Sequence, residues 1–263
     1  MKKFAGILLI LVGACGAAAY TIDLAQFTDP TKGFSVAGAV WLRYALVAAL
    51  ILIAALASLM AARRPAAMEK RNLPLALGLA VCGAACAAVG ALELLGTKTV
   101  AYKAFLLGIL GLAAAWWMLT LCAHWGSSGA RRPVGGIRLG IAGSTFFLAL
   151  TLVRFAGNYS SVYRFAQTMQ TFSALAALLL SSILLRVGFF PESRWGRKEY
   201  MTGMWAFYLC TCCEVPQGVA RYLWGQTPVS ELAFSLLLGC IGLLGAGVAL
   251  SALGQEAETA EEA

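Results

Sequence analysis

Eight apolar runs, each long enough to cross a membrane as a helix, determine what this chain can fold into. About 20 residues at about 1.5 Å each span the roughly 30 Å hydrocarbon layer of a bilayer. The runs lie near residues 4–20, 35–62, 73–96, 103–125, 136–157, 166–190, 201–223 and 230–253. We therefore predict an all-α fold, a polytopic integral membrane bundle of eight transmembrane helices.

The rest of the chain is too short for a second domain. Of the 263 residues, 60% are hydrophobic and only 12% are charged, whereas about 25% of an average soluble protein is charged. The loops between the runs are short. We therefore predict one transmembrane domain, residues 1–253, followed by an acidic cytoplasmic tail at residues 254–263.

Basic residues occur in clusters at the ends of the apolar runs, on alternate sides of the eight-helix arrangement. The clusters are Lys2 and Lys3; Arg63, Arg64, Lys70 and Arg71; Arg131 and Arg132; and Arg194, Arg197 and Lys198. This distribution follows the positive-inside rule, so we predict that both termini are cytoplasmic and that the cell membrane is the location. The net charge of +8 then reflects topology, and the expected partner is the lipid bilayer, with no nucleic acid.

The first run has two interpretations. Its basic start, short apolar core and small residues are also typical of a signal peptide, and cleavage would leave seven spans. An uncleaved helix already fits the alternation of charge, and we favour it.

Charged residues inside the spans mark a candidate site. Each costs at least about 2.5–3.5 kcal/mol in lipid, so such residues usually face the bundle interior and find partners. In the predicted topology they gather in the outer half of the membrane. The candidate substrate-binding residues are Arg43, Glu93, Arg154, Gln167, Glu214, Gln217 and Arg221.

The seventh run contains the strongest pointer to a site. Helical spacing places Cys210, Cys213, Glu214, Gln217 and Arg221 on one face. Proline at position 216 lacks an N–H and clashes with the carbonyl four residues earlier. We expect a kink there and a free carbonyl, which is tolerated at membrane depth where it lines a cavity.

The cysteines do not predict a metal or redox site. All eight lie within predicted spans, where cysteine behaves as a small apolar residue. A tetrahedral zinc site needs about four converging ligands, but Cys212 points about 200° around the helix from Cys210, and the only histidine, His124, is predicted at the cytoplasmic side. We predict no metal, no cofactor and no catalytic residues.

Three functional hypotheses follow. The first is a small-solute permease, or a membrane solute-binding or sensing component, whose arginines hold a polar or anionic solute in an outer cavity. The second is a non-catalytic structural or assembly subunit in which Arg43, Arg154 and Arg221 pair with glutamates and lock the bundle. The third, a membrane-embedded enzyme, has no recognisable set of catalytic partners, so we lean against enzymatic activity.

Overall fold

The computed structural model describes residues 2–29, 40–61, 71–96, 102–127, 135–157, 165–190 and 196–253, and the fold is all-α. The predicted tail at 254–263 and the start of the second predicted span lie outside these residues. The elements are α1 (Lys2–Phe27), α2 (Val40–Ala57) with a 3-10 turn (Ser58–Met60), α4 (Leu73–Gly96), α5 (Tyr102–Gly126), α6 (Gly136–Gly157), α7 (Phe165–Phe189), α8 (Gly196–Ala206), the π-helical segment η2 (Phe207–Glu214), α9 (Val215–Leu223) and α10 (Val229–Ala252).

Seven of the described helices are long and apolar enough to cross a membrane. They are α1, α2 with its 3-10 turn, α4, α5, α6, α7 and α10. The remaining predicted span, 201–223, lies within α8, η2 and α9, which follow one another without a break from Gly196 to Leu223. The chain is thus a polytopic, multi-pass membrane protein.

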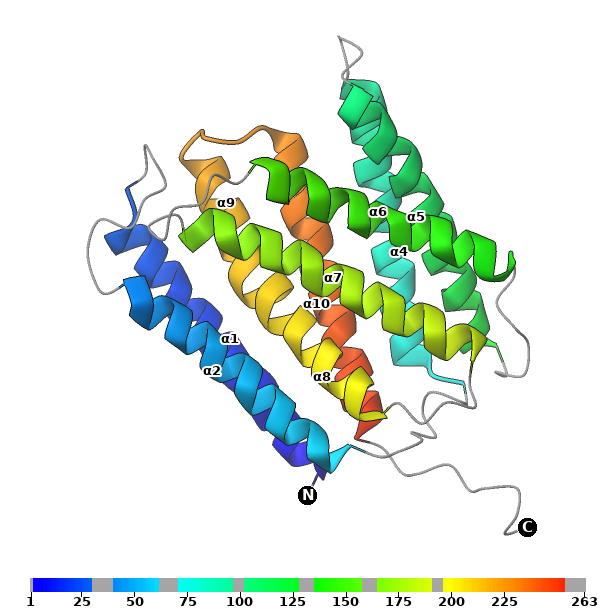
Figure 1. Cartoon of the computed structure of the whole chain (residues 1–263), viewed down its shortest axis with the longest axis horizontal. Helices are drawn as coiled ribbons and strands as arrows, with labels where there is room; N and C mark the ends of the chain where they lie inside the picture. The colour runs from blue at the N-terminus through cyan, green and yellow to red at the C-terminus, as the bar shows by residue number, and fades with distance from the viewer. Residues whose placement is uncertain are drawn as a thin grey trace.

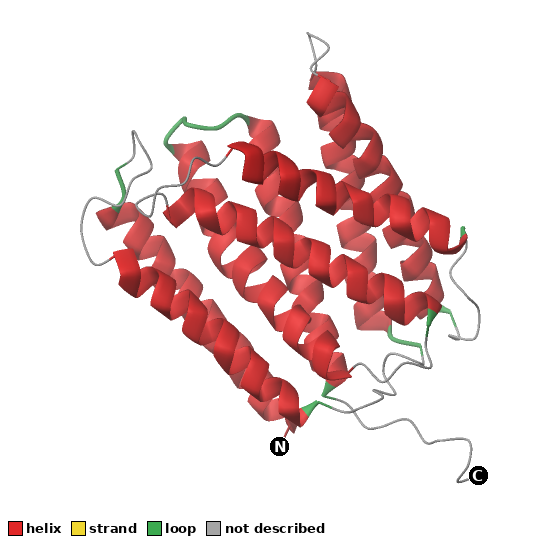
Figure 2. Cartoon of the chain, in the orientation of Figure 1, coloured by secondary structure: helices red, strands yellow, loops and turns green. Residues whose placement is uncertain are grey.

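The helices are arranged around α10 and the α8–η2–α9 segment, as Figures 1 and 2 show. α1 and α2 lie on one side, α4 and α5 on the other, and α6 and α7 cross one face of the bundle. Successive helices run in opposite directions. Asn72, just before α4, accordingly donates its backbone N–H to the Trp125 carbonyl at the end of α5 (3.0 Å) and its side-chain amide to Ser251 at the end of α10 (3.1 Å).

The main core lies between α4, α5, α6, α7 and α10, where small residues let the helices approach closely. A Cβ added at Gly90 of α4 would meet the Gly108 carbonyl oxygen of α5 at 2.9 Å. One added at Gly203 of α8 would collide with the Gly245 carbonyl oxygen of α10. Between helices in lipid, such van der Waals packing takes the place of the hydrophobic effect.

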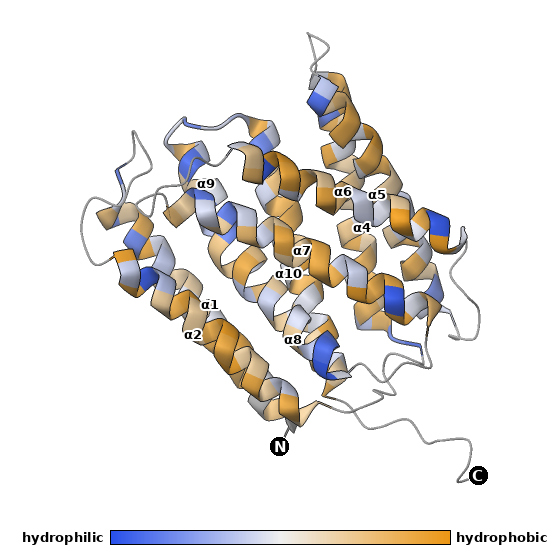
Figure 3. Ribbon diagram, in the orientation of Figure 1, coloured by the Kyte–Doolittle hydropathy of each residue, from blue (hydrophilic) through white to orange (hydrophobic). Residues whose placement is uncertain are grey.

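α1 and α2 are the least buried helices of the described bundle. Only 6% of the residues in the apolar window of α2 are buried, compared with 67% in α10. Phe4 and Trp41 are 72% and 71% exposed, and Figure 3 shows α2 as hydrophobic along most of its length. These faces suit contact with lipid.

The first helix is longer than predicted. α1 continues to Phe27, seven residues past the predicted end at residue 20, which places Asp23 inside the helix and not in an outer loop. The apolar neighbours Ile22 and Leu24 favour this extension, and Arg43 of α2 offsets the charge of Asp23.

Candidate functional site

A buried polar cluster surrounds Glu214, the last residue of η2, whose side chain is 0% exposed. Arg154 of α6 donates from Nη2 to Glu214 Oε1 at 2.8 Å. Ser235 of α10 donates to the same oxygen at 2.9 Å, and Ser173 of α7 donates to Oε2 at 2.9 Å. Both oxygens of the carboxylate are therefore bonded, and one side chain joins η2 to three other helices. We call these four residues the Glu214 cluster.

Further hydrogen bonds anchor the cluster to α7 and α9. Arg154 also donates from Nη1 to the Gln170 carbonyl at 2.8 Å and to Ser173 Oγ at 3.2 Å. The amide oxygen of Gln170 accepts from Arg221 Nη1 at 3.0 Å. Arg221 thus binds the cluster through a glutamine and not through a glutamate.

The π-helical segment sets the direction of the side chains before Pro216. The backbone remains helical on both sides of it, with φ and ψ of −60° and −42° at Ala206 and −63° and −52° at Val215. A π turn carries more residues than an α turn, so it rotates the residues that follow. Such local adjustments are how membrane helices accommodate proline, and here the wider turn ends at Glu214, two residues before Pro216.

Because of this rotation, Cys210 and Cys213 do not share the helix face on which regular helical spacing had placed them. The Cys210 thiol donates to the Ser173 carbonyl of α7 (3.1 Å), whereas Cys213 lines a cavity beside α1. Regular spacing of about 3.6 residues per turn, which we assumed, does not hold through η2. The prediction of one shared face is wrong for these two cysteines.

Gln217 connects α9 to α7 and α1. Its Nε2 donates to the Ala166 carbonyl at 2.8 Å, and its Oε1 accepts from the Tyr20 hydroxyl at 3.4 Å. Close by in the sequence, Gly218 faces Ser235 so closely that a Cβ would collide with it. This contact lets Ser235 reach Glu214.

A second ion pair lies apart from the Glu214 cluster. Arg43 Nη2 of α2 contacts Asp23 Oδ1 of α1 at 2.9 Å, and the two side chains are 12% and 27% exposed. The other oxygen of this carboxylate, Asp23 Oδ2, is buried and has no hydrogen-bond partner in the part of the chain that the structure describes.

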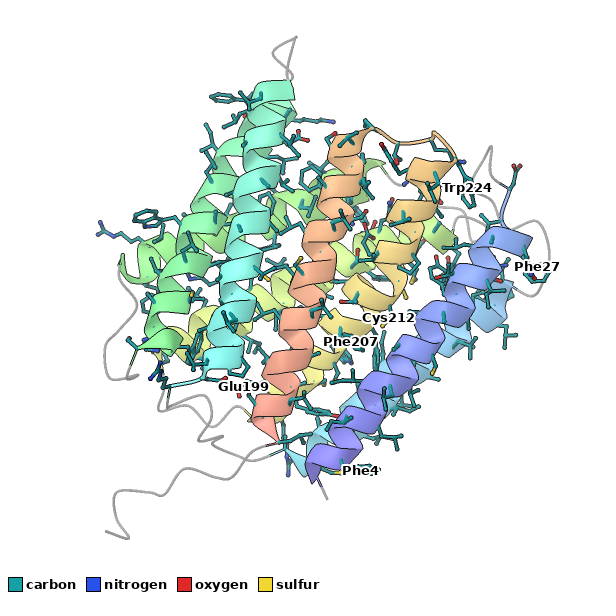
Figure 4. All side chains as sticks on the ribbon, turned by 180° about the vertical axis from the view of Figure 1, so that it is seen from behind. Phe4, Phe27, Glu199, Phe207, Cys212 and Trp224 are labelled. Atoms are coloured by element: carbon teal, nitrogen blue, oxygen red, sulfur yellow. The ribbon has the colours of Figure 1, made fainter. Side chains whose placement is uncertain are left out.

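The Arg43–Asp23 pair lines a cavity of about 560 Å³ between α1 and α2. Cys212 and Cys213 of η2, together with Phe165 of α7, close its inner side. Figure 4, which labels Cys212, shows this part of η2 beside α1. The volume falls within the range of about 300–1,000 Å³ that is usual for small-molecule sites.

The structure brings only some of the predicted site residues together. Arg154 and Glu214 contact each other directly, and Gln217 and Arg221 join α9 to α7. Gln167 lies on α7 with a buried amide oxygen that has no hydrogen-bond partner among the described residues.

The other two predicted residues lie elsewhere. Arg43 belongs to the cavity between α1 and α2. Glu93 is near the end of α4, with Glu231 of α10 as its charged neighbour. Of the seven predicted residues, the structure thus joins Arg154 with Glu214 and places Arg43 with Asp23 in the cavity.

Sequence reasoning missed Asp23, Tyr20, Gln170 and Ser173. Asp23 was predicted to lie in an outer loop, and its position 20 residues before Arg43 in the sequence gives no clue that the two meet. The spacing of Gln170 and Ser173, at i and i+3 on a helix, does predict a shared polar face. The spacing in the sequence therefore indicated that Gln170 and Ser173 lie on the same side of α7.

Nothing in the described residues resembles a metal centre. The eight cysteines are free, and no group of three or more His, Cys, Asp or Glu side chains among the described residues could hold a metal ion. Comparison with protein-family models, with curated proteins and with solved structures finds no match. The site must be interpreted from its own geometry.

Proposed function

We propose that this protein is a small-solute permease, or a solute-binding or sensing component of the membrane, and that its solute occupies the cavity between α1 and α2. The observation that carries the proposal is an ion pair, Arg43–Asp23, on the wall of a cavity of about 560 Å³. Ligand sites are typically mostly apolar with a few placed polar groups, and this cavity has that character.

The Glu214 cluster supports a different role within the same protein. Its carboxylate is fully buried and both oxygens already accept hydrogen bonds, so it has little left to offer a solute. We infer that it holds η2 against α6, α7 and α10 as a rigid wall behind the cavity. This assigns Glu214 and Arg154 to architecture and Arg43 to binding.

The membrane orientation is part of the proposal. Arg138 at the start of α6, Arg186 near the end of α7 and Arg197 at the start of α8 belong to one end of the bundle. Figure 4 labels Glu199 at that end, together with Phe4 of α1, and Phe27 and Trp224 at the other. By the positive-inside rule the basic end is cytoplasmic. The Arg43–Asp23 pair then lies in the outer half of the cell membrane.

A solute screen by thermal unfolding tests the function. A molecule that binds only the folded protein stabilises it by about 2.7 kcal/mol at 100 times its Kd. The screen includes small polar solutes and short-chain amphiphiles, and we expect at least one of them to raise the Tm of the wild-type protein as its concentration rises. We expect the double variant Asp23→Asn/Arg43→Gln to lose this rise.

The double variant is chosen because it removes both charges together. Removing Arg43 alone would leave the Asp23 carboxylate without its ion-pair partner, with a large cost to folding. Lys103→Gln, at an exposed position of α5, is the matched control and should keep the full rise in Tm. If no solute raises the Tm, or if the double variant responds like the wild type, the proposal is wrong.

The structural-subunit hypothesis is the second candidate, and the saturated Glu214 cluster is the observation that favours it. It predicts that neither ion pair responds to any solute. It also predicts that another membrane protein co-purifies with this one in stoichiometric amount from mild detergent. A substitution on the lipid-facing side of α1 or α2, for example Trp41→Ala, should then cause the loss of that partner.

A further inference from the structure

We propose that the ligand of the α1–α2 cavity is an amphiphile with a single hydrocarbon chain and a hydroxyl or ammonium head group, which reaches the cavity from the bilayer. This inference rests on the proposed function, because it names the ligand class of the same cavity.

The cavity is long, as a hydrocarbon chain requires. Its wall on α1 extends from Val12 to Phe27, which is about 22 Å along a helix that rises about 1.5 Å per residue. Its wall on α2 extends from Leu42 to Ile53, about 16 Å by the same rise. A compact polar solute would leave most of this length empty.

The polar groups lie toward one end of this length. Asp23 and Arg43 are near the end of α1 and the start of α2, and Tyr20 is one turn further in. Deeper along both helices the wall consists of apolar residues such as Val12, Leu50 and Ile53. A head group at the ion pair and a chain along the apolar part fit this order.

Hydrogen bonding at Asp23 selects the head group. Oδ1 of this carboxylate is bonded to Arg43, while the buried Oδ2 has no hydrogen-bond partner among the described residues. A carboxylate can accept about four hydrogen bonds, and the Asp23 side chain is 27% exposed, so a ligand that brings an O–H or N–H can donate to it. A carboxylate head group would instead face the negative charge of Asp23.

The chain alone cannot provide selectivity. Lipid tails are as apolar as leucine side chains, so a hydrocarbon chain gains little by leaving the bilayer for the cavity. Discrimination must come from the head group and from the space that the chain occupies. The sparse burial of α1 and α2 leaves their outer faces against lipid, which gives the amphiphile a lateral route between them.

Gly16 of α1 offers a way to fill the cavity without disturbing the protein. It lines the cavity, and a Cβ added there would meet no atom within 4 Å. Gly16→Leu therefore places a side chain in the space proposed for the hydrocarbon chain. Gly247→Leu is the matched control, because Gly247 of α10 also has no atom within 4 Å of an added Cβ and does not line the cavity. Both changes favour the helix, since leucine has the higher helix propensity.

Photolabelling in lipid nanodiscs tests the inference. The host lipid is phosphatidylcholine, whose head group has no hydrogen-bond donor and should not compete. Three probes share one diazirine-bearing alkyl chain and differ in their head group: alcohol, primary amine or carboxylate. The labelled fraction is measured by intact mass and the labelled residues are located by peptide mass spectrometry.

We expect the alcohol and amine probes to label α1 and α2 saturably in the wild type and in Gly247→Leu, and Gly16→Leu to lose this labelling. A hydrogen bond to a charged group corresponds to about tenfold or more in affinity, so the carboxylate probe should label at least about tenfold less. Equal labelling of Gly16→Leu and wild type, or equal labelling by all three probes, shows contact with bulk lipid only and overturns the inference.

The two proposals can fail separately. If a solute from the thermal screen depends on the Asp23–Arg43 pair and still binds Gly16→Leu, the cavity binds a ligand but not through a hydrocarbon chain. If the double variant Asp23→Asn/Arg43→Gln has no effect on any solute or probe, both the proposed function and the ligand class are wrong.

Discussion

Replacing Glu214 by glutamine removes the charge that offsets a buried arginine. The Arg154 side chain is 9% exposed and contacts Glu214 Oε1 at 2.8 Å. Removal of one member of a buried ion pair typically costs about 3–5 kcal/mol, because the other charge is left unpaired. Arg154 keeps its bonds to the Gln170 carbonyl and to Ser173, and the new amide keeps one acceptor. We therefore expect the low end of this range, about 3 kcal/mol.

The measurement is reversible unfolding in mixed micelles, with helical circular dichroism followed as a denaturing detergent is added. Folded proteins are typically stable by only about 5–15 kcal/mol, so a loss of about 3 kcal/mol should shift the midpoint clearly. Glu231→Gln is the control. Glu231 is exposed in the first turn of α10, where a carboxylate is worth about 0.3–1 kcal/mol through the helix dipole.

A double-mutant cycle separates the ion pair from other effects of the amide. In Glu214→Gln/Arg154→Gln two neutral amides face each other, so the double variant should lose less stability than the sum of the two single variants. The coupling expected for groups in contact is about 0.5–3 kcal/mol. Strict additivity, or a Glu214→Gln variant no less stable than Glu231→Gln, would refute the assignment of this pair to architecture.

Two further predictions concern packing and capping. Gly203→Ala should lower the free energy of unfolding by about 1–3 kcal/mol through overpacking, because the added methyl group collides with the Gly245 carbonyl oxygen. Gly247→Ala is the control and should be neutral or stabilising, because its methyl group meets open space. Equal Tm values for the two variants would contradict the close contact of α8 and α10. Asn72→Ala should lower the free energy of unfolding by at least about 1 kcal/mol, because it removes the oxygen that accepts from the Leu75 N–H at 3.2 Å and the amide that donates to Ser251. Asn72→Asp retains the acceptor and loses the amide, as Ala does, so it should be more stable than Asn72→Ala; equal Tm values for the two variants would contradict a contribution from the cap.

The positions of the helices could be predicted closely from hydrophobicity. The predicted spans 73–96 and 136–157 coincide with α4 and α6, and the spans near 103–125, 166–190 and 230–253 differ from α5, α7 and α10 by one residue at each end. Long apolar runs leave one solution in lipid, since every backbone polar group must bond within its own helix. The predicted end of the first span, residue 20, was wrong because the residues from Thr21 onward were predicted as an outer loop.

The partners within the site could be predicted less well. Arg154 with Glu214 agrees with the hypothesis that arginines pair with glutamates, but Arg43 pairs with an aspartate and Arg221 with the amide of Gln170. Spacing along one helix shows which side chains share a face, but it does not show which face of another helix they meet. The π turn before Pro216 added a second difficulty, because it rotates Cys213 away from the face of Cys210.

Hydrophobic patterning is enough to predict a membrane bundle for this chain, because the cost of exposing peptide groups to hydrocarbon acts locally on each run of residues. The sequence also shows which charged residues require partners, since the cost of burying a charge belongs to the residue itself. Which charges meet depends on how the helices pack, and that packing depends on small residues and shape far apart in the chain. It encloses Glu214 between four helices and places Asp23 beside a long cavity, with one carboxylate oxygen that has no hydrogen-bond partner among the described residues.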